Sequence, residues 1–163
     1  MFTDSEADRL LRLPKRAIDG ALIIDLNKEK TRINLVSDDE EFEFLFQYHR
    51  TLKVSFFRMS CHHLVTSGSI GILRVCYGKR HTNPIVALSP NLTELAGISF
   101  DIDEPHAHFY VRGYPNLDWA RPVLQSGYTI KVLNNINDLE TIIREFCSLI
   151  HLNSQIHIQN SLL

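Results

Sequence analysis

One short stretch of the chain places an aromatic residue at every second position: Phe42, Phe44, Phe46 and Tyr48. Successive side chains of a β-strand point to opposite faces, so these four rings share one face. Aromatic residues favour strands, and a period of two is not the period of a helix. We therefore predict a strand whose aromatic side faces the core. The minor alternative is an aromatic platform for a ligand.

Strand-like patterns fill the middle of the chain, and helical patterns occur only near its ends. Strands are predicted at 21–26, 31–36, 54–64, 70–77, 85–88 and 105–112, and the first two are expected to form a hairpin. A loop or short extended piece is expected at 119–124. The residues from 153 to 163 are expected to pack as a short helix or strand.

Two helices are predicted. Thr3 and Glu6 match a capping box for a helix over residues 3–13, which Pro14 ends. Apolar residues at three- and four-residue spacing predict an amphipathic helix over 136–152, capped by Asn135 or Asn137. Strands in a run with a helix at each end indicate an α+β fold with a mainly antiparallel sheet of about 6–8 strands.

Composition limits the class of protein. At 163 residues, 44% hydrophobic and 22% charged, the chain fits a single globular domain over residues 1–163. A net charge of -2 does not support nucleic-acid binding, although a local basic patch remains open. The three cysteines have no C-x-x-C spacing, and no apolar leader or membrane-spanning segment is apparent. We therefore expect a cytoplasmic protein with no membrane association.

The segment 105–112 concentrates side chains that can do chemistry. Alternation places His106, His108, Tyr110 and Arg112 on one face of a strand, which we expect to be half-exposed. The other face, Ala107, Phe109 and Val111, is expected to face the core. The first face is the best candidate for a site.

A metal site is one interpretation of this face. Two histidines at i and i+2 can converge on one ion, and zinc at His106 and His108 is the specific possibility. A third ligand has to come from elsewhere. The candidates for it are His81, His62, His63, Asp101 and Asp103.

Acid–base chemistry without a metal is a second interpretation. His106 and His108 would act as general base and general acid, with His81 and Tyr110 assisting. A nearby cation would stabilise the phosphate in a metal-independent cleavage of RNA. The candidate cations are Arg112, Arg80 and Lys79.

A non-enzymatic interaction module is the leading interpretation, with a protein partner or a homodimer face as its target. Tyr, Trp and Arg are enriched at the energetic centres of interfaces. They are dense here, as Arg80, Tyr110, Arg112, Tyr114, Trp119 and Arg121. A nucleic-acid version would stack bases on the rings. In a purely structural alternative, His106 and His108 bond to neighbouring strands or carboxylates and Trp119 caps the core.

Several short motifs follow one another in the second half of the chain. They are Arg80-His-Thr-Asn-Pro84, His106-x-His108-x-Tyr110, Gly113-Tyr114 and Trp119-Ala-x-Pro122, followed by a terminal amphipathic helix and Ile158-Gln-Asn-Ser-Leu162. In this order the chain resembles a small uncharacterised bacterial family, a domain of unknown function. The resemblance implies a small antiparallel-sheet domain, often in mobile-element neighbourhoods. It implies no established activity and assigns no catalytic residues.

Overall fold

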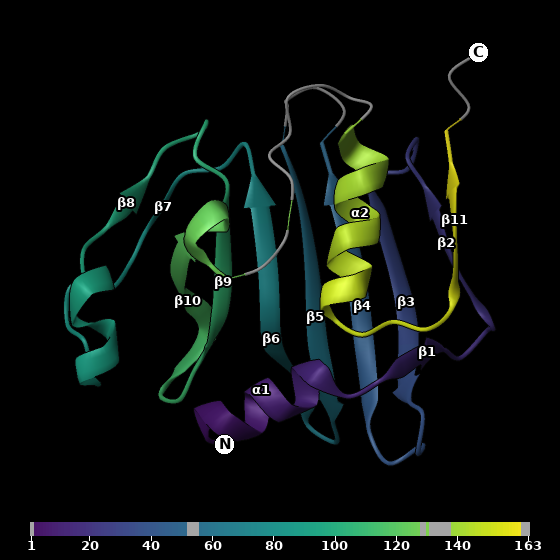
Figure 1. The fold of residues 1–163 in the computed structure, drawn as a ribbon, viewed down its shortest axis with the longest axis horizontal. Coiled ribbons are helices and arrows are strands. Elements are labelled where there is room, and N and C mark those ends of the chain that lie inside the picture. Colours follow the sequence, from purple (N-terminus) through teal and green to yellow (C-terminus); the bar gives the residue numbers. More distant parts are fainter. Residues whose placement is uncertain (1, 52–55, 128–129, 131–137, 161–163) are drawn as a thin grey trace.

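An antiparallel sheet organises the computed structural model, which describes residues 2–51, 56–127, 130 and 138–160 (Figure 1). In the described residues this sheet has seven strands in the order β1-β3-β4-β5-β6-β9-β10. They are β1 (Lys15–Ala17), β3 (Lys30–Ser37), β4 (Glu43–Arg50), β5 (Phe57–Val65), β6 (Gly68–Tyr77), β9 (His106–Val111) and β10 (Tyr114–Pro122). Every neighbouring pair is antiparallel, which confirms the predicted α+β class.

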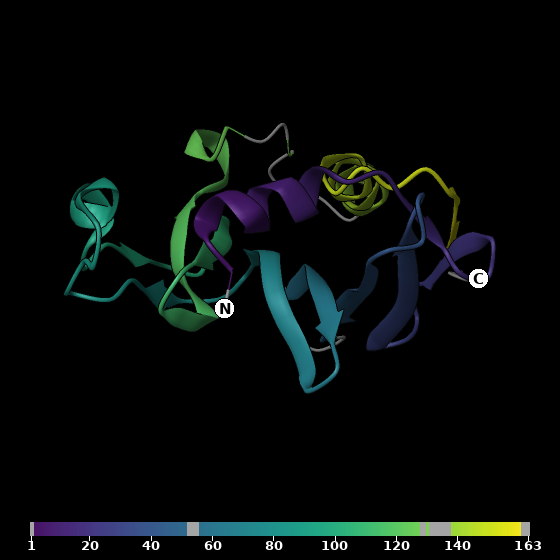
Figure 2. The ribbon, with the colours of Figure 1, turned by 90° about the horizontal axis from the view of Figure 1, so that it is seen from below.

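Two α-helices lie on the same side of this sheet (Figure 2). α1 (Asp4–Arg12) begins at the predicted capping box, where both Thr3–Glu6 hydrogen bonds are present. α2 (Asp138–Leu149) buries Ile142, Ile143 and Phe146 completely. Both predicted helices are therefore confirmed, while the proposed caps of α2 lie outside the described residues.

The core lies between the helices and the sheet. Phe44, Phe46 and Tyr48 are at most 1% exposed, and the Phe46 ring lies 6.0 Å from that of Phe146 on α2. The aromatic run on β4 is thus the core-facing side of a strand, as predicted. The opposite side of the sheet carries no helix in the described part of the chain (Figure 2).

Shorter elements flank the main sheet. β2 (Ala21–Asp25) pairs in parallel with β11 (Gln155–Gln159), and β7 (His81–Thr82) pairs with β8 (Ser99–Phe100). Two 3-10 helices, η1 (Pro90–Leu95) and η2 (Val123–Gln125), complete the described elements. The β7–β8 pair extends past the β10 edge of the main sheet (Figure 1).

Two local predictions are wrong. The hairpin of 21–26 with 31–36 does not form, because β2 pairs with the distant β11 and β3 pairs with β1 and β4. Residues 85–88 are not a strand, and Ile85 is 84% exposed. Residues 119–122, expected as a loop or a short extended piece, are extended and belong to β10, a longer strand with an irregular register.

A buried Cys–His cluster as a candidate metal centre

The two histidines of the H-x-H motif lie on β9, between β6 and β10. Strand register sets His106 opposite Cys76 and His108 opposite Arg74 on β6. Residues paired across antiparallel strands lie on the same face. The open side of the sheet therefore presents two imidazoles beside one thiol and one guanidinium.

This face is buried, so the expectation of a half-exposed strand is wrong. His106 is 0% exposed and His108 2%. The cause is the β7–β8 pair, whose rings cover them: Phe100 stacks on His106 at 4.8 Å, and the His81 ring lies 4.4 Å from that of His108. Ala107 and Val111 on the other face are buried as predicted, and Phe109 is half-buried.

Backbone carbonyls fix the orientation of both imidazoles. His106 Nδ1 lies 2.9 Å from Glu104 O, and His108 Nδ1 lies 2.7 Å from Leu117 O. A carbonyl only accepts, so each Nδ1 carries the hydrogen and each Nε2 keeps its lone pair. Arg74 Nη2 donates to Leu117 O at 3.2 Å and lies 3.1 Å from His108 Nδ1, but the shorter contact of that Nδ1 with Leu117 O, at 2.7 Å, assigns the hydrogen to it. His106 Nε2 is fully buried and has no hydrogen-bond partner among the described residues.

An irregularity in β10 supplies these carbonyls. The β9–β10 register shifts between Tyr114 and Trp119, and Leu117 has a positive φ of 55°. The carbonyls of Leu117 and Asp118 then accept hydrogen bonds from His108 and His81. Gly71 permits this arrangement, because a Cβ there would lie 2.8 Å from Leu117 Cδ1.

Cys76 completes a group of three potential metal ligands. One ligand atom from each of Cys76, His106 and His108 lies within 4.8 Å of the other two, and all three side chains are buried. Tetrahedral zinc with these ligands would need separations of about 3.3–3.6 Å, from its bond lengths of about 2.0–2.3 Å. A bound ion would therefore require the three ligand atoms to move closer together.

His81 lies beside this group, with its ring 4.4 Å from that of His108. Its Nε2 is 2.9 Å from Asp118 O and 3.0 Å from Asn83 Oδ1, so that nitrogen carries the hydrogen. The Asn83 amide in turn accepts from Ala120 N and donates to Ala120 O, as a neighbouring strand would. These bonds tie β7 to the edge of β10 and leave His81 Nδ1 with the lone pair.

The electrostatic environment keeps the imidazoles neutral. Burial lowers the pKa of His106 and His81, and burial together with the Arg74 charge lowers the pKa of His108 to about 2. Burial raises the pKa of the Cys76 thiol, and the positive charge of Arg74 opposes that rise. Neutral imidazole is the form that binds metals.

The remaining predicted site residues do not join the cluster. The Tyr110 hydroxyl donates to Phe2 O, the Tyr114 hydroxyl donates to Val86 O, and Arg80 pairs with Asp101. Arg112 is exposed, and its backbone N–H donates to Asp4 Oδ1. Among the other suggested third ligands, His62 contacts Ser60, His63 packs with Phe2, Phe42 and Phe44, and Asp103 is exposed.

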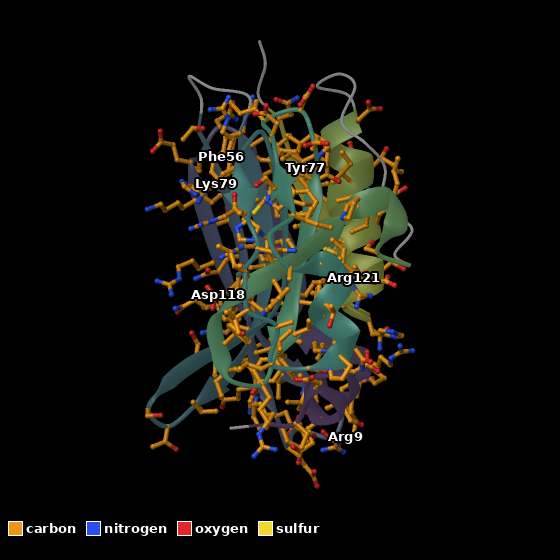
Figure 3. All side chains as sticks on the ribbon, turned by 90° about the vertical axis from the view of Figure 1, so that its left-hand side faces the viewer. Arg9, Phe56, Tyr77, Lys79, Asp118 and Arg121 are labelled. Carbon is orange, nitrogen blue, oxygen red and sulfur yellow. The ribbon has the colours of Figure 1, made fainter. Side chains whose placement is uncertain are left out.

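A single exposed surface over 106–121 is therefore not present. Trp119 is fully buried against Leu92 and Val111, and Arg121 lies over the Phe109 ring at 4.6 Å. Asp118 and Arg121, close together on β10, point to opposite sides of the sheet (Figure 3). Strand alternation separates the residues that looked contiguous in sequence.

The protein is thus an α+β domain with an antiparallel sheet, helices on one face and a Cys–His cluster on the other. It belongs to a family of unknown function, DUF6978, whose model matches residues 2–152, so the resemblance noted above is confirmed. No curated protein and no solved structure gives a match. In the described part of the chain, no helix has the length and apolar character needed to cross a membrane.

Proposed function

We propose that the protein binds one transition-metal ion, Zn²⁺ by preference, through Cys76, His106 and His108. The observation that carries this proposal is the approach of the three ligand atoms to within 4.8 Å of one another in a buried site. One thiolate with two imidazoles suits zinc and copper far better than the oxygen-preferring Mg²⁺ or Ca²⁺.

The surroundings support this proposal. Metal-bound histidines usually donate their other N–H to a carbonyl or carboxylate, and both His106 and His108 donate Nδ1–H to a backbone carbonyl. A buried imidazole nitrogen without a partner, as at His106 Nε2, costs free energy unless a ligand engages it.

We assign the fourth position to His81, which lies outside the group of three but whose ring is 4.4 Å from that of His108, and this gives the metal a structural role. The ion would then join β7 to β6 and β9 and hold the β7–β8 pair over the sheet. Four protein ligands are typical of structural zinc sites, whereas catalytic sites keep one position for water. The burial of the cluster favours this role over an acid–base pair that must reach a polymeric substrate.

A reducing, cytoplasmic setting is part of the proposal. All three cysteines are free and buried. The bacterial origin rests on the family resemblance, and a homodimer or protein partner stays a prediction.

The test is the metal content of protein purified without a polyhistidine tag. We expect about one zinc per chain by mass spectrometry, and a thiolate-to-metal charge-transfer band when Co²⁺ replaces it. Cys76→Ser, His106→Gln and His108→Gln should each weaken affinity by more than about 100-fold, since they remove a ligand and not only its support.

Matched controls alter the same residue types outside the cluster. Cys147→Ala on α2 and His62→Gln on β5 should keep full zinc content. Equal zinc binding by the ligand variants and the wild type would overturn the proposal, as would the absence of 1:1 binding. If only His81→Ala keeps wild-type affinity, the ion has three protein ligands and the structural assignment fails.

A further inference from the structure

Basic side chains gather on the helix-free side of the sheet, next to the cluster, since Arg58 on β5 is paired with Cys76 on β6. Register places Lys30 beside His49 and His49 beside Arg58, in one row across β3, β4 and β5. Arg32 lies two residues along β3, on the same face. Nitrogen-tipped side chains extend from the side of the sheet opposite α2, where Phe56 and Lys79 also lie (Figure 3).

These side chains line a groove. A hollow of about 170 Å³ is lined by Lys30, Arg32, Gln47, His49 and Arg58, with Thr31 and Tyr48. Neighbouring strands are about 4.8 Å apart and alternate residues about 6.8 Å apart along a strand. The backbones of Lys30, Arg32 and Arg58 therefore span about 10 Å across the strands and about 7 Å along them. This spacing suits one extended chain of phosphates.

The charges of the groove are not neutralised by neighbouring carboxylates. The four ion pairs of the described residues are Asp8–Arg12, Arg16–Glu40, Arg80–Asp101 and Glu140–Arg144, and none of them involves this face. Beyond the effect of burial, the charges of Arg58 and Lys30 lower the pKa of His49 more than the Glu29 carboxylate raises it. A chain with a net charge of -2 thus carries a segregated positive face.

An aromatic ring, that of Phe56, lies beside the groove residue His49. The Phe56 ring meets that of His49 edge-on at 5.6 Å, and Lys79 Nζ lies 5.9 Å from its centroid. Phe56 is half-buried, so the residue keeps some contact with solvent. A ring beside a cationic groove is the arrangement with which proteins stack single-stranded bases.

We propose that this face binds single-stranded nucleic acid, with Lys30, Arg32 and Arg58 on the phosphates and Phe56 under a base. A groove and a ring favour a single strand over an anionic membrane, which would need a flat or protruding surface. The groove and the cluster share no residue, but they adjoin each other, because Arg58 is paired with Cys76 across β5 and β6.

Fluorescence anisotropy of a labelled 12-residue oligouridine tests the proposal. We expect binding at 50 mM salt that weakens as salt rises, with a log–log slope of about -2 for three phosphate contacts. Lys30→Glu/Arg58→Glu should weaken binding at least about ten-fold, because it replaces two contacts with repulsion. Phe56→Ala should weaken it about five-fold or more through lost stacking.

The control makes the same charge change on the helices. Arg12→Glu/Arg144→Glu removes only surface ion pairs and should bind like the wild type. Equal weakening in both double variants would show that net charge alone acts and overturn the proposal. Binding to phosphatidylserine vesicles without binding to the oligonucleotide would also overturn it. Arg32→Gln, a milder change, gives the same comparison if the double variant fails to fold.

Discussion

Lys15 and His106 are both polar and both 0% exposed, yet their surroundings differ completely. Lys15 Nζ donates to three carbonyls, those of Leu11 at 2.8 Å, Leu13 at 2.7 Å and Ile150 at 3.1 Å. It also lies 4.5 Å from the centroid of the Phe44 ring. His106 uses one ring nitrogen, and its Nε2 has no hydrogen-bond partner among the described residues.

The difference separates a structural group from a binding group. The carbonyls that Lys15 contacts lie at the C-terminal ends of α1 and α2, where the helix dipole favours a positive charge. All of its donors have a use within the fold. His106 leaves an acceptor in a dry environment, which is favourable only when something else binds there.

Lys15→Met should give the largest loss of stability. Methionine keeps the apolar stem but leaves the Leu11 and Ile150 carbonyls buried without a donor, at about 1–3 kcal/mol each, partly offset by removing a buried charge. We expect the free energy of unfolding in urea to fall by about 3 kcal/mol, with or without metal. Lys28→Met, at an exposed position, should stay within about 0.5 kcal/mol. A Lys15→Met protein as stable as the wild type would remove the contrast with His106.

The buried charge of Lys15 also predicts a pH dependence. Burial lowers its pKa from 10.5 to about 8, so above pH 8 the unfolded chain binds more protons than the folded one. Stability from this group therefore rises with pH, by up to about 1.4 kcal/mol per unit. Urea unfolding between pH 7.5 and 9 should show this rise in the wild type relative to Lys15→Met. Above pH 9, titration of buried cysteines in the unfolded chain acts in the opposite direction.

The sequence predicts the helix-covered face far better than the open one. The aromatic run on β4 and the apolar spacing in α2 report local periodicity, and both elements formed as expected. The full length of β10 was not predicted, because the irregularity at Leu117 interrupts its alternation. The pairing of β2 with β11 joins segments more than a hundred residues apart, and no local pattern encodes it.

The candidate site was only partly predictable, because it too depends on contacts between segments that are distant in sequence. The H-x-H motif is visible in sequence, and His81 was among its expected partners. Cys76 was missed, because its approach to His106 depends on the register of β6 against β9. Strand alternation correctly grouped His106 with His108, but burial by the β7–β8 pair is a tertiary contact. The one available signal was the strand-like pattern around Cys76 itself.

His106→Leu should give the smallest change, and it tests the comparison most directly. When a chelator keeps the protein free of metal, the variant loses one hydrogen bond to Glu104 O and no longer buries an unpartnered nitrogen. We therefore expect its free energy of unfolding to lie within about 1 kcal/mol of the wild-type value. With zinc at about 100 times its dissociation constant, the wild type should gain about 2.7 kcal/mol and the variant nothing. Paired urea titrations with and without zinc measure both numbers. If His106→Leu instead lowered the free energy of unfolding as much as Lys15→Met does, with the chelator present, His106 would be a structural residue. The two buried groups would then be alike.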